Sequence, residues 1–350
     1  MRTGKIPFIA NLALTLVSLI ALGYLLVLGQ SIIAPFFFAF LLAMLFRPLA
    51  QFLEEKLRFP RLISTFTCVL IIITLLVGLS FFFSSELSDF SKDIPHLKDQ
   101  FSQLFHDSQT WVNDTFHINA DTQFDYLNKG LDKLLSSSGA ILGFTLNVFS
   151  ASLGFFSFCI IFFVFILAYR RVLYDFIVSV FADKHVAKVK QAVTEIENMM
   201  KSYLIGVCIQ IIIVSILASV ILSILGVKYA ILIGVLSGLL NVIPYIGIAI
   251  SGLIACLFAF ATNSPITCLY AAMGYIGIHL IDGNIILPFV VGSKVKINAL
   301  FTFIGIIVGA SLWGISGMFL CIPAMAIFKI ISSKSDNLEP WGAVLGEGKS

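Results

Sequence analysis

The chain has 350 residues, of which 59% are apolar and 12% are charged, and its mean hydropathy is +1.02. Average soluble domains are about 45–50% apolar and about 25% charged, so water cannot be the main solvent of this chain. A soluble enzyme, a nucleic-acid-binding module, a disordered chain and a secreted disulfide scaffold are therefore excluded for the chain as a whole, and the net charge of +3 indicates no nucleic-acid partner.

Three apolar runs open the chain. The first (6–28) is too long for a signal peptide and lacks a small-residue cleavage site, and the second (32–46) follows almost at once, so together they predict a helical hairpin in the membrane. The third run covers 62–83. The loop between the second and third runs (47–61) holds four basic residues and two acids, which places this loop and the N-terminus in the cytoplasm by the positive-inside rule.

Residues 84–140 differ in character, with nine acids and four lysines. The excess of five negative charges is typical of an extracytoplasmic face. Apolar residues recur at helical spacing, which predicts a small helical domain with a face for packing against itself or a neighbouring subunit. The two apolar seams are Leu87, Phe90, Ile94, Leu97, Phe101 and Leu104, and then Phe124, Leu127, Leu131 and Leu134.

A long apolar run (140–169) returns the chain to the cytoplasmic side, where Arg170 and Arg171 begin a stretch with six basic and four acidic residues that ends at Lys201. One face of this stretch is apolar and predicts an amphipathic helix, either lying on the membrane or docking a partner. That face consists of Val186, Val189, Val193, Ile196 and Met200.

Two over-long apolar stretches mark the C-terminal third. After an ordinary span (205–225), the first stretch (230–261) is interrupted at Asn241–Gly247 by a proline and a glycine, and each of its arms has about 14 residues, which is short for a full crossing. After another span (266–281), the second stretch (299–331) is broken in the same way at Trp313–Gly317. Interrupted segments in corresponding positions of two halves are typical of inverted-repeat transporters.

Each broken stretch is either a re-entrant helical hairpin or a full crossing in a plain eight-span protein. Hairpins place four lysines on the cytoplasmic side, whereas full crossings put two of them outside, so the positive-inside rule favours hairpins. These lysines are Lys294, Lys296, Lys329 and Lys334. The predicted fold is an all-α polytopic membrane protein with about eight transmembrane segments, two of them broken, plus the small extracytoplasmic domain.

Strongly polar side chains are rare in the apolar segments, and His279, Asp282 and Asn284 form the tightest group. An aspartate at a helix centre costs roughly 2.5–3.5 kcal/mol to insert, so one found there usually faces a cavity or a partner, although at the membrane interface the cost is small. Gly283 and Pro288 indicate a local break that exposes carbonyl groups. Asn241 either satisfies the backbone of its own break or binds a substrate. The candidate transport path comprises Asn241, Pro244, Tyr245, Gly247, His279, Asp282, Asn284, Pro288, Gly314 and Gly317.

No enzyme motif is found. Asp282 has no second intramembrane acid for an aspartyl protease, and neither His-Glu-x-x-His nor Gly-x-Ser-x-Gly is present. The six cysteines have no metal-ligand or redox spacing and predict small core hydrophobes. No catalytic residue, metal site or cofactor is therefore expected.

At its breaks the chain resembles a known family, the autoinducer-2 exporter family of PerM-like permeases. The resemblance rests on Pro244-Tyr-Ile-Gly247, on Asp282-Gly-Asn-Ile-Ile-Leu-Pro288 followed by Gly292, and on the region from Gly309 to Gly317 with Pro323. It extends to the layout of three N-terminal spans, a variable extracytoplasmic segment, a fourth span and a motif-rich C-terminal part.

This resemblance implies an inner-membrane permease, with family members linked to export of autoinducer-2 and others to sodium–proton exchange. It also implies a homo-oligomer, with a pentamer and an elevator-like moving core as one arrangement. The chain departs from the family where proline is common at the positions of Ile248 and Ala299, and where a glutamine and a glutamate are common at those of His279 and Asp282. These departures concern the substrate rather than the fold.

The main hypothesis is a multi-pass permease of the bacterial inner membrane that moves a small polar solute, with both termini cytoplasmic and with coupling to protons or sodium through His279 and Asp282. A sodium–proton antiporter and a membrane scaffold acting through residues 84–140 are the alternatives. The lipid bilayer, the solute and further copies of the chain are the expected partners. The predicted domains are 1–83 (first three spans), 84–140 (extracytoplasmic), 141–201 (fourth span and amphipathic helix), 202–332 (transport core) and 333–350 (cytoplasmic tail).

Overall fold

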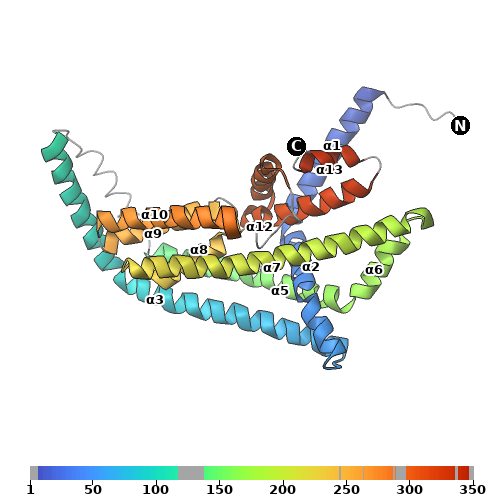
Figure 1. Cartoon of the computed structure of the whole chain (residues 1–350), viewed down its shortest axis with the longest axis horizontal. Coiled ribbons are helices and arrows are strands. Elements are labelled where there is room, and N and C mark those ends of the chain that lie inside the picture. Colours follow the sequence, from blue (N-terminus) through green and yellow to red (C-terminus); the bar gives the residue numbers. More distant parts are fainter. Residues whose placement is uncertain are drawn as a thin grey trace. The chain divides into compact units, whose positions relative to one another are not determined.

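The chain folds into helices throughout the part that the computed structural model describes (Figure 1). The described residues are 7–116, 138–243, 246–262, 264–286, 288, 297–335 and 338–346. Six helices are long and apolar enough to cross a membrane, or seven if the bent pair of α5 and α6 counts as one span. The shorter α8 and α9 make up a further apolar segment, so the prediction of an all-α polytopic membrane protein is confirmed.

The helices in chain order are α1 (Phe8–Leu28), α2 (Gln30–Glu55), α3 (Arg61–Phe116), α5 (Ser138–Ala168), α6 (Arg170–Ser179), the 3₁₀ turn η1 (Asp183–His185), α7 (Val186–Ile224), α8 (Ala230–Leu240), α9 (Ile246–Thr262), α10 (Pro265–Ile281), the π-helical turn η2 (Asp282–Ile286), α12 (Ala299–Lys334) and α13 (Glu339–Leu345).

The contacts between these helices divide the chain into two compact units. The first unit is Met1–Val69, Leu153–Leu204 and Ser293–Ser350, and the second is Leu70–Ser152 and Ile205–Gly292. This grouping leaves the predicted domain boundaries as predictions.

Aromatic side chains join α2 to α5 and α12 in the first unit. Phe38 of α2 stacks on Phe319 of α12 and meets Phe155 of α5 edge to face, with ring centroids 5.3 Å apart in both pairs. Phe46 of α2 likewise meets Phe163 of α5. Such pairs contribute about 0.5–1.5 kcal/mol each beyond their buried area, so they fix which faces of these three apolar helices meet.

The long helix α12 doubles back on itself at Trp313 and Gly314. Both residues have non-helical backbone angles, and Gly314 has a φ of 60°, which favours glycine. On either side of the turn, Gly309 and Gly317 pack backbone to backbone, so a Cβ atom on either residue would overlap the carbonyl group of the other. Residues eight apart in a straight helix would lie about 12 Å from each other. This contact therefore shows an antiparallel hairpin.

Both ends of α12 lie beside the C-terminal helix α13. The backbone N–H of Asn298, at the start of α12, donates to the Leu345 carbonyl at 2.9 Å, and Gly342 packs against Ser332 and Ser333 at the other end of α12. The first arm, 299–312, has about 14 residues and a length of about 21 Å, which is shorter than the hydrocarbon core. The stretch thus returns to the side from which it starts, as the hairpin prediction requires.

The tip of this hairpin is fastened to α1. The indole Nε1–H of Trp313 donates to the Leu26 carbonyl at 2.9 Å, and the ring of Trp313 contacts that of Phe37. Leu26 lies in the last turn of α1, where carbonyl groups have no N–H partner in the helix. In hydrocarbon such a group costs several kcal/mol unless a protein donor satisfies it. Trp313 supplies that donor.

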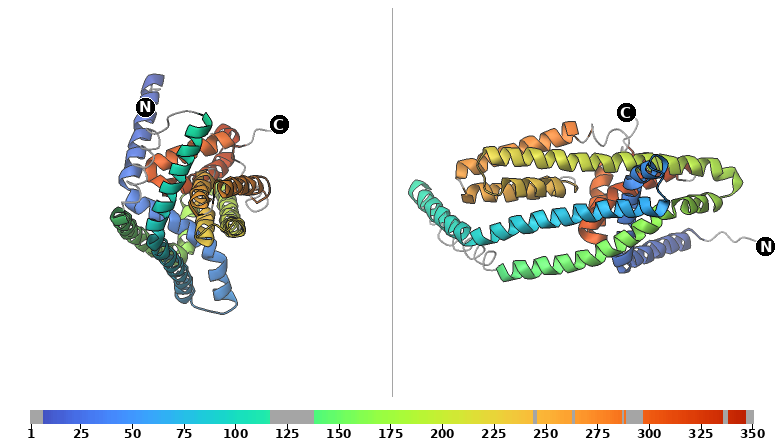
Figure 2. Two further views of the ribbon diagram at one scale, coloured as in Figure 1. Left: turned by 90° about the vertical axis from the view of Figure 1, so that its left-hand side faces the viewer. Right: turned by 90° about the horizontal axis from the view of Figure 1, so that it is seen from below.

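In the second unit, α8, α9 and α10 pack against the second half of α7 around a core of small and β-branched side chains (Figure 2). The interrupted stretch 230–261 forms α8 and α9, which run antiparallel: the Tyr229 ring meets the Phe258 ring at the open end, and Gly247 packs against the Leu240 carbonyl near the tip. With 11 and 17 residues, these helices are about 16 and 26 Å long. This stretch too is a helical hairpin.

Two predicted boundaries fall inside continuous helices. The segment 186–200 is the first part of α7, which begins at Val186 and continues to Ile224 with no break, and Met200 of its predicted apolar face is buried. The predicted extracytoplasmic domain begins as a continuation of α3, which ends only at Phe116. Its second seam lies outside the described residues. The relation of the two broken stretches as an inverted repeat stays a prediction.

The close approach of Gly309 and Gly317 makes either position sensitive to a single methyl group. We expect Gly309→Ala to lower the free energy of unfolding by about 1–3 kcal/mol, the usual cost of overpacking. Gly23→Ala on α1 is the control, because a Cβ atom there meets nothing within 4 Å. Thermal unfolding of the purified protein in detergent measures both, and equal melting temperatures for the two variants would contradict the hairpin contact.

Trp313→Phe keeps an aromatic ring at the tip and removes the donor to the Leu26 carbonyl. We expect a loss of about 1–3 kcal/mol, because the Leu26 carbonyl at the end of α1 would be left without a donor in hydrocarbon. Trp341→Phe is the control, since Trp341 is 63% exposed on α13. The same melting assay decides: a Trp341→Phe variant as unstable as Trp313→Phe would show that the indole N–H contributes nothing specific.

Candidate functional site: a buried carboxylate at a hairpin tip

Asp282 lies where α10 changes into a π-helical turn. The helix begins with Ser264, whose hydroxyl accepts the Thr267 N–H at 3.2 Å, and with Pro265 in its first turn. At its end the wider turn Asp282–Ile286 follows, and the side-chain amide of Asn284 donates to the Leu280 carbonyl at 2.8 Å. Single π turns of this kind are frequently found at functional sites.

Asp282 is buried and accepts hydrogen bonds from two neutral amides. The Nε2 group of Gln210 on α7 lies 2.9 Å from Oδ1 and 3.0 Å from Oδ2. The Nδ2 group of Asn241, the residue that ends α8 at the hairpin tip, lies 3.1 Å from Oδ2. All three residues are less than 9% exposed. We call Gln210, Asn241 and Asp282 the carboxylate site.

The chemistry of the carboxylate site follows from the neutrality of its donors. A carboxylate removed from water needs several hydrogen bonds or a cation, and the recorded partners of Asp282 among the described residues are amides only. Amide groups do not cancel the negative charge. An amide that turns about its last bond can also accept a hydrogen bond from the O–H of the acid form, because it has both a donor and an acceptor end. The site therefore holds a carboxylate whose charge its hydrogen-bond partners leave uncancelled.

A second polar link joins the same two helices. The Ser237 hydroxyl lies 2.6 Å from the Tyr275 hydroxyl and also donates to the Ile233 carbonyl at 2.7 Å, so Tyr275 is the donor between them. Ser237 precedes Asn241 by one helical turn and Tyr275 precedes Asp282 by about two. Polar groups thus bond α8 to α10 at two levels in an otherwise apolar interface.

The residues predicted to line the transport path do not all lie at the carboxylate site. His279 and Asn284 are exposed on the outer face of α10 and η2, so the predicted group of His279, Asn284 and Asp282 does not assemble around the carboxylate. Pro288 is exposed. Gly247 lies near the first hairpin tip and Gly314 and Gly317 in the second, whereas Pro244 and Tyr245 lie outside the described residues. Asn241 and Asp282 are the two candidates that the structure brings together.

Sequence analysis missed Gln210, Ser237 and Tyr275. Gln210 has a signal, because it is the only carboxamide in the apolar run 205–225, and a polar group in such a span needs a partner. Ser237 and Tyr275 have none, since serine and tyrosine are common in membrane helices without any functional role. Only the meeting of three distant segments shows that these residues form one site.

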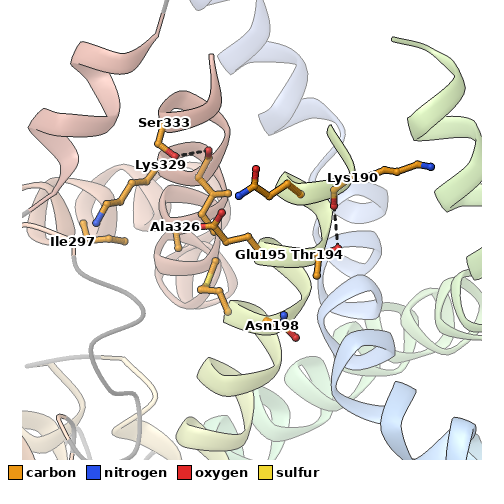
Figure 3. A pocket seen from close by; sticks show the side chains of 11 residues that line it. Lys190, Thr194, Glu195, Asn198, Ile297, Ala326, Lys329 and Ser333 are labelled. Carbon is orange, nitrogen blue, oxygen red and sulfur yellow. Dashed lines mark hydrogen bonds between the residues drawn. The ribbon is translucent and has the colours of Figure 1, made fainter. Parts of the chain in front are cut away.

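The first unit holds a separate cavity of about 740 Å³ between the start of α7 and the two ends of α12 (Figure 3). Its charged lining residues are Lys190, Glu195 and Lys329, and Glu195 also pairs with Lys334 at 3.1 Å. Ile297 and Ser333, from opposite ends of α12, both line it. The cavity thus lies at the end of the unit where α12 begins and ends. No three His, Cys, Asp or Glu side chains gather as metal ligands in the described parts of the chain.

Membrane-length helices, a hairpin tip and a buried carboxylate between helices define a class: polytopic membrane proteins of the secondary-transporter kind. The comparison with family models agrees, since residues 15–336 match the AI-2E family transporter model. The chain belongs to the AI-2E transporter family. The family resemblance predicted from the sequence is thereby confirmed.

Individual relatives are distant. The chain is 25% identical over 330 residues to a Haemophilus influenzae protein named "Putative transport protein", which covers 91% of both chains. It is 24% identical over 304 residues to the AI-2 transport protein TqsA of Escherichia coli K12, covering 86% of both. A Bacillus subtilis relative, YrrI, is 28% identical over 137 residues, which span only 38% of that protein.

The carboxylate site makes a prediction about stability. Gln210→Leu would leave Asp282 with a single donor, so we expect a loss of about 1–3 kcal/mol. Gln191→Leu, an exposed glutamine on the same helix, should change the melting temperature little. In an Asp282→Leu background the Gln210→Leu change should cost less than half as much, because no carboxylate remains to be satisfied. An equal cost in both backgrounds would contradict the assignment.

Proposed function

We propose that this chain is an inner-membrane permease that moves a small polar solute, with Asp282 as its ion-coupling group. The observation that carries the proposal is the carboxylate site, where one buried acid bonds a hairpin tip to two membrane helices through neutral amides. Ionisable groups inside membrane helices commonly mark ion and substrate pathways.

The proposed coupling follows from the position of Asn241. Because this residue ends α8, its bond to Asp282 ties the hairpin tip to α10. Binding of a proton or a sodium ion by Asp282 would change which amide groups it attracts, and the tip would gain or lose its tie. Coupling between ion and solute needs only such a difference in affinity between two states.

The substrate is proposed at the level of class. The relative TqsA is named as an AI-2 transport protein, so autoinducer-2 is the first solute to test. Sodium–proton antiport is the alternative within the same family, and it would use the same carboxylate without a solute. Both functions depend on Asp282, and they differ in whether an uncharged polar molecule crosses.

Orientation and assembly complete the proposal. Arg47 and Arg61 from the predicted loop and Arg170 from the fourth span line one pocket of the first unit, which supports the prediction that both segments face the cytoplasm. Lys334 pairs with Glu195 at the start of α7, which supports a cytoplasmic C-terminal tail. The division of the chain into two compact units suits an elevator-like motion of one unit, within a homo-oligomer.

Flux in proteoliposomes tests the permease. Asp282→Asn keeps the size of the side chain and removes its charge, so we expect coupled flux of autoinducer-2 to fall at least tenfold. Asp183→Asn, in an exposed turn, should leave the flux unchanged. Imposed pH and sodium gradients identify the coupling ion. Undiminished flux in Asp282→Asn would refute the coupling role, and ion exchange without solute flux would favour the antiporter.

Deleting residues 84–140 distinguishes a membrane scaffold from the proposed permease. A transporter core should keep part of its flux without this segment, whereas a scaffold that recruits partners through it should lose its function entirely.

A further inference from the structure

A second polar site lies in the first unit, around the ends of α2 and α5 and the starts of α3 and α6. It is a pocket of about 490 Å³, within the usual size range of small-molecule sites. We call it the arginine pocket. Its lining residues are Arg47, Gln51, Glu54, Glu55, Arg61, Arg170, Arg171, Tyr174, Asp175 and Glu197.

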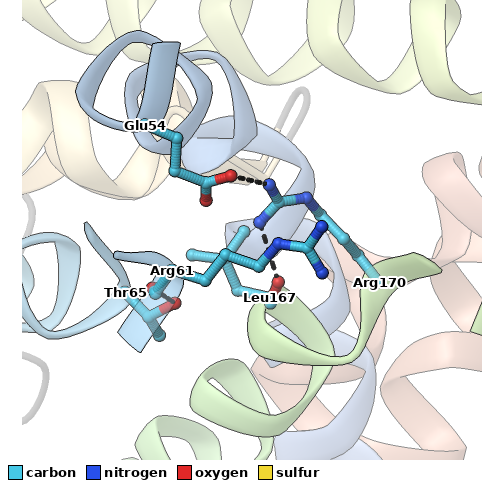
Figure 4. A network of polar contacts seen from close by, with 5 residues as sticks. All are labelled: Glu54, Arg61, Thr65, Leu167 and Arg170. Atoms are coloured by element: carbon cyan, nitrogen blue, oxygen red, sulfur yellow. Dashed lines mark hydrogen bonds and ion pairs between the residues drawn. The ribbon is translucent and has the colours of Figure 1, made fainter. Parts of the chain in front are cut away.

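Half of the charges in the arginine pocket are already paired. Arg170 and Glu54 form an ion pair at 2.6 Å, with each side chain 15% exposed, and Arg170 also donates to the Leu167 carbonyl at 3.0 Å (Figure 4). Arg47 pairs with Glu197. These bonds fix the walls of the pocket, because charge-assisted pairs that are largely shielded from water hold their geometry.

The other half of the charges has no partner within the described chain. Neither Arg61 nor Arg171 forms an ion pair, and neither Glu55 nor Asp175 does. Two buried atoms of the paired residues are also unsatisfied: Nε of Arg47, a donor, and Oε1 of Glu54, an acceptor. The pocket therefore offers unpaired groups of both signs to a ligand.

The arrangement of two arginines favours an anion as the ligand of the arginine pocket. Arg61 on α3 and Arg170 on α6 extend toward each other, so that their guanidinium groups lie next to one another, while Glu54 bonds only Arg170 (Figure 4). Glu54 balances the charge of Arg170 and leaves that of Arg61 without an ion-pair partner among the described residues, so an anion beside Arg61 would be attracted by both guanidinium groups. Guanidinium groups match the oxygens of a phosphate in shape and charge.

The surroundings of the arginine pocket indicate a membrane interface. The chain bends by 71° between α5 and α6, and α6 presents exposed apolar side chains on one face, including Val172 and Phe176, each 63% exposed. Leu57 and Leu62, which flank Arg61 in the α2–α3 loop and at the start of α3, are 51% and 62% exposed. A polar pocket surrounded by exposed apolar side chains can contact both the headgroup and the acyl chains of a lipid.

We propose that the arginine pocket binds the headgroup of an aminophospholipid, a lipid that carries a phosphate and a primary ammonium group, as in phosphatidylethanolamine. Arg61 and Arg171, the two arginines of the pocket without an ion-pair partner in the described segments, bind the phosphate, with the Arg170 guanidinium beside Arg61 (Figure 4). The ammonium group lies among the unpaired carboxylates of Glu55 and Asp175. The acyl chains lie along the exposed apolar side chains of α6 and the α2–α3 loop. Four arginines and four acids line the pocket, so a zwitterion fits it better than a lipid with net negative charge.

Lipid affinity is measurable on the full-length protein by native mass spectrometry, after delipidation and addition of lipids with identical acyl chains. We expect phosphatidylethanolamine to bind at least fivefold more tightly than phosphatidylcholine, whose quaternary ammonium donates no hydrogen bond, and than phosphatidylglycerol, which has no cation. Equal binding of all three lipids would overturn the proposal.

Variants locate the site. Arg61→Gln and Arg171→Gln should each weaken phosphatidylethanolamine binding about tenfold, while Arg58→Gln, in the same loop but outside the pocket, should change it less than twofold. Asp175→Asn should bring the affinity for phosphatidylethanolamine close to that for phosphatidylcholine. Because none of these side chains has an ion-pair partner, the lipid-free melting temperature should stay constant. An Arg58→Gln variant that loses as much affinity as Arg61→Gln would refute the site.

Soluble competitors separate a lipid site from a phosphate site. Phosphoethanolamine at millimolar concentration should displace the bound lipid, and inorganic phosphate at the same concentration should not, because it lacks the ammonium group. Displacement by inorganic phosphate to the same extent would show a simple anion site and overturn the assignment to an aminophospholipid.

Discussion

The structure depends on one constraint: in hydrocarbon, each backbone polar group must find a partner within the protein. Continuous helices meet it by themselves, and the breaks in this chain do not. At the α12 turn, the indole of Trp313 satisfies the Leu26 carbonyl of a neighbouring helix. At the π turn, the side-chain amide of Asn284 donates a hydrogen bond to the Leu280 carbonyl. At both of these breaks a polar side chain therefore bonds a backbone carbonyl group.

The chain holds two shielded carboxylates, Glu54 and Asp282, with different kinds of hydrogen-bond partner. Glu54 in the arginine pocket bonds a guanidinium, so its charge is balanced on the spot. Asp282 is as well shielded but bonds only amides, which leave its charge in place. A structural role is served best by the first arrangement, since removing one partner of a buried pair is costly. The second arrangement leaves the charge of Asp282 uncancelled, and the proposed coupling role would use that charge.

Much of the fold can be predicted from the sequence, because spans and breaks are each marked by neighbouring residues in the chain. Run lengths give the spans, and Pro244, Gly247 and Gly314 interrupt two apolar stretches that the structure shows as hairpins. The site is less predictable, since side chains distant in sequence meet there. Asp282 stands out as a rare acid, but its partner Gln210 is 72 residues away. His279 looks like a partner by its spacing, yet its side chain is exposed whereas Asp282 is buried.

The two hairpins are fastened by different chemistry, and this difference assigns them different roles. Trp313 holds the α12 tip by an indole N–H and a carbonyl, neither of which titrates or binds ions, so this tip stays fastened under all conditions. Asn241 holds the α8 tip through the Asp282 carboxylate, the group that binds the coupling ion in the proposed permease. Under the proposed coupling role, an ion at Asp282 would loosen the α8–α9 hairpin and leave the α12 hairpin fastened. In the proposed permease, the α8–α9 hairpin is the gate that responds to the ion and the α12 hairpin is part of the fixed frame.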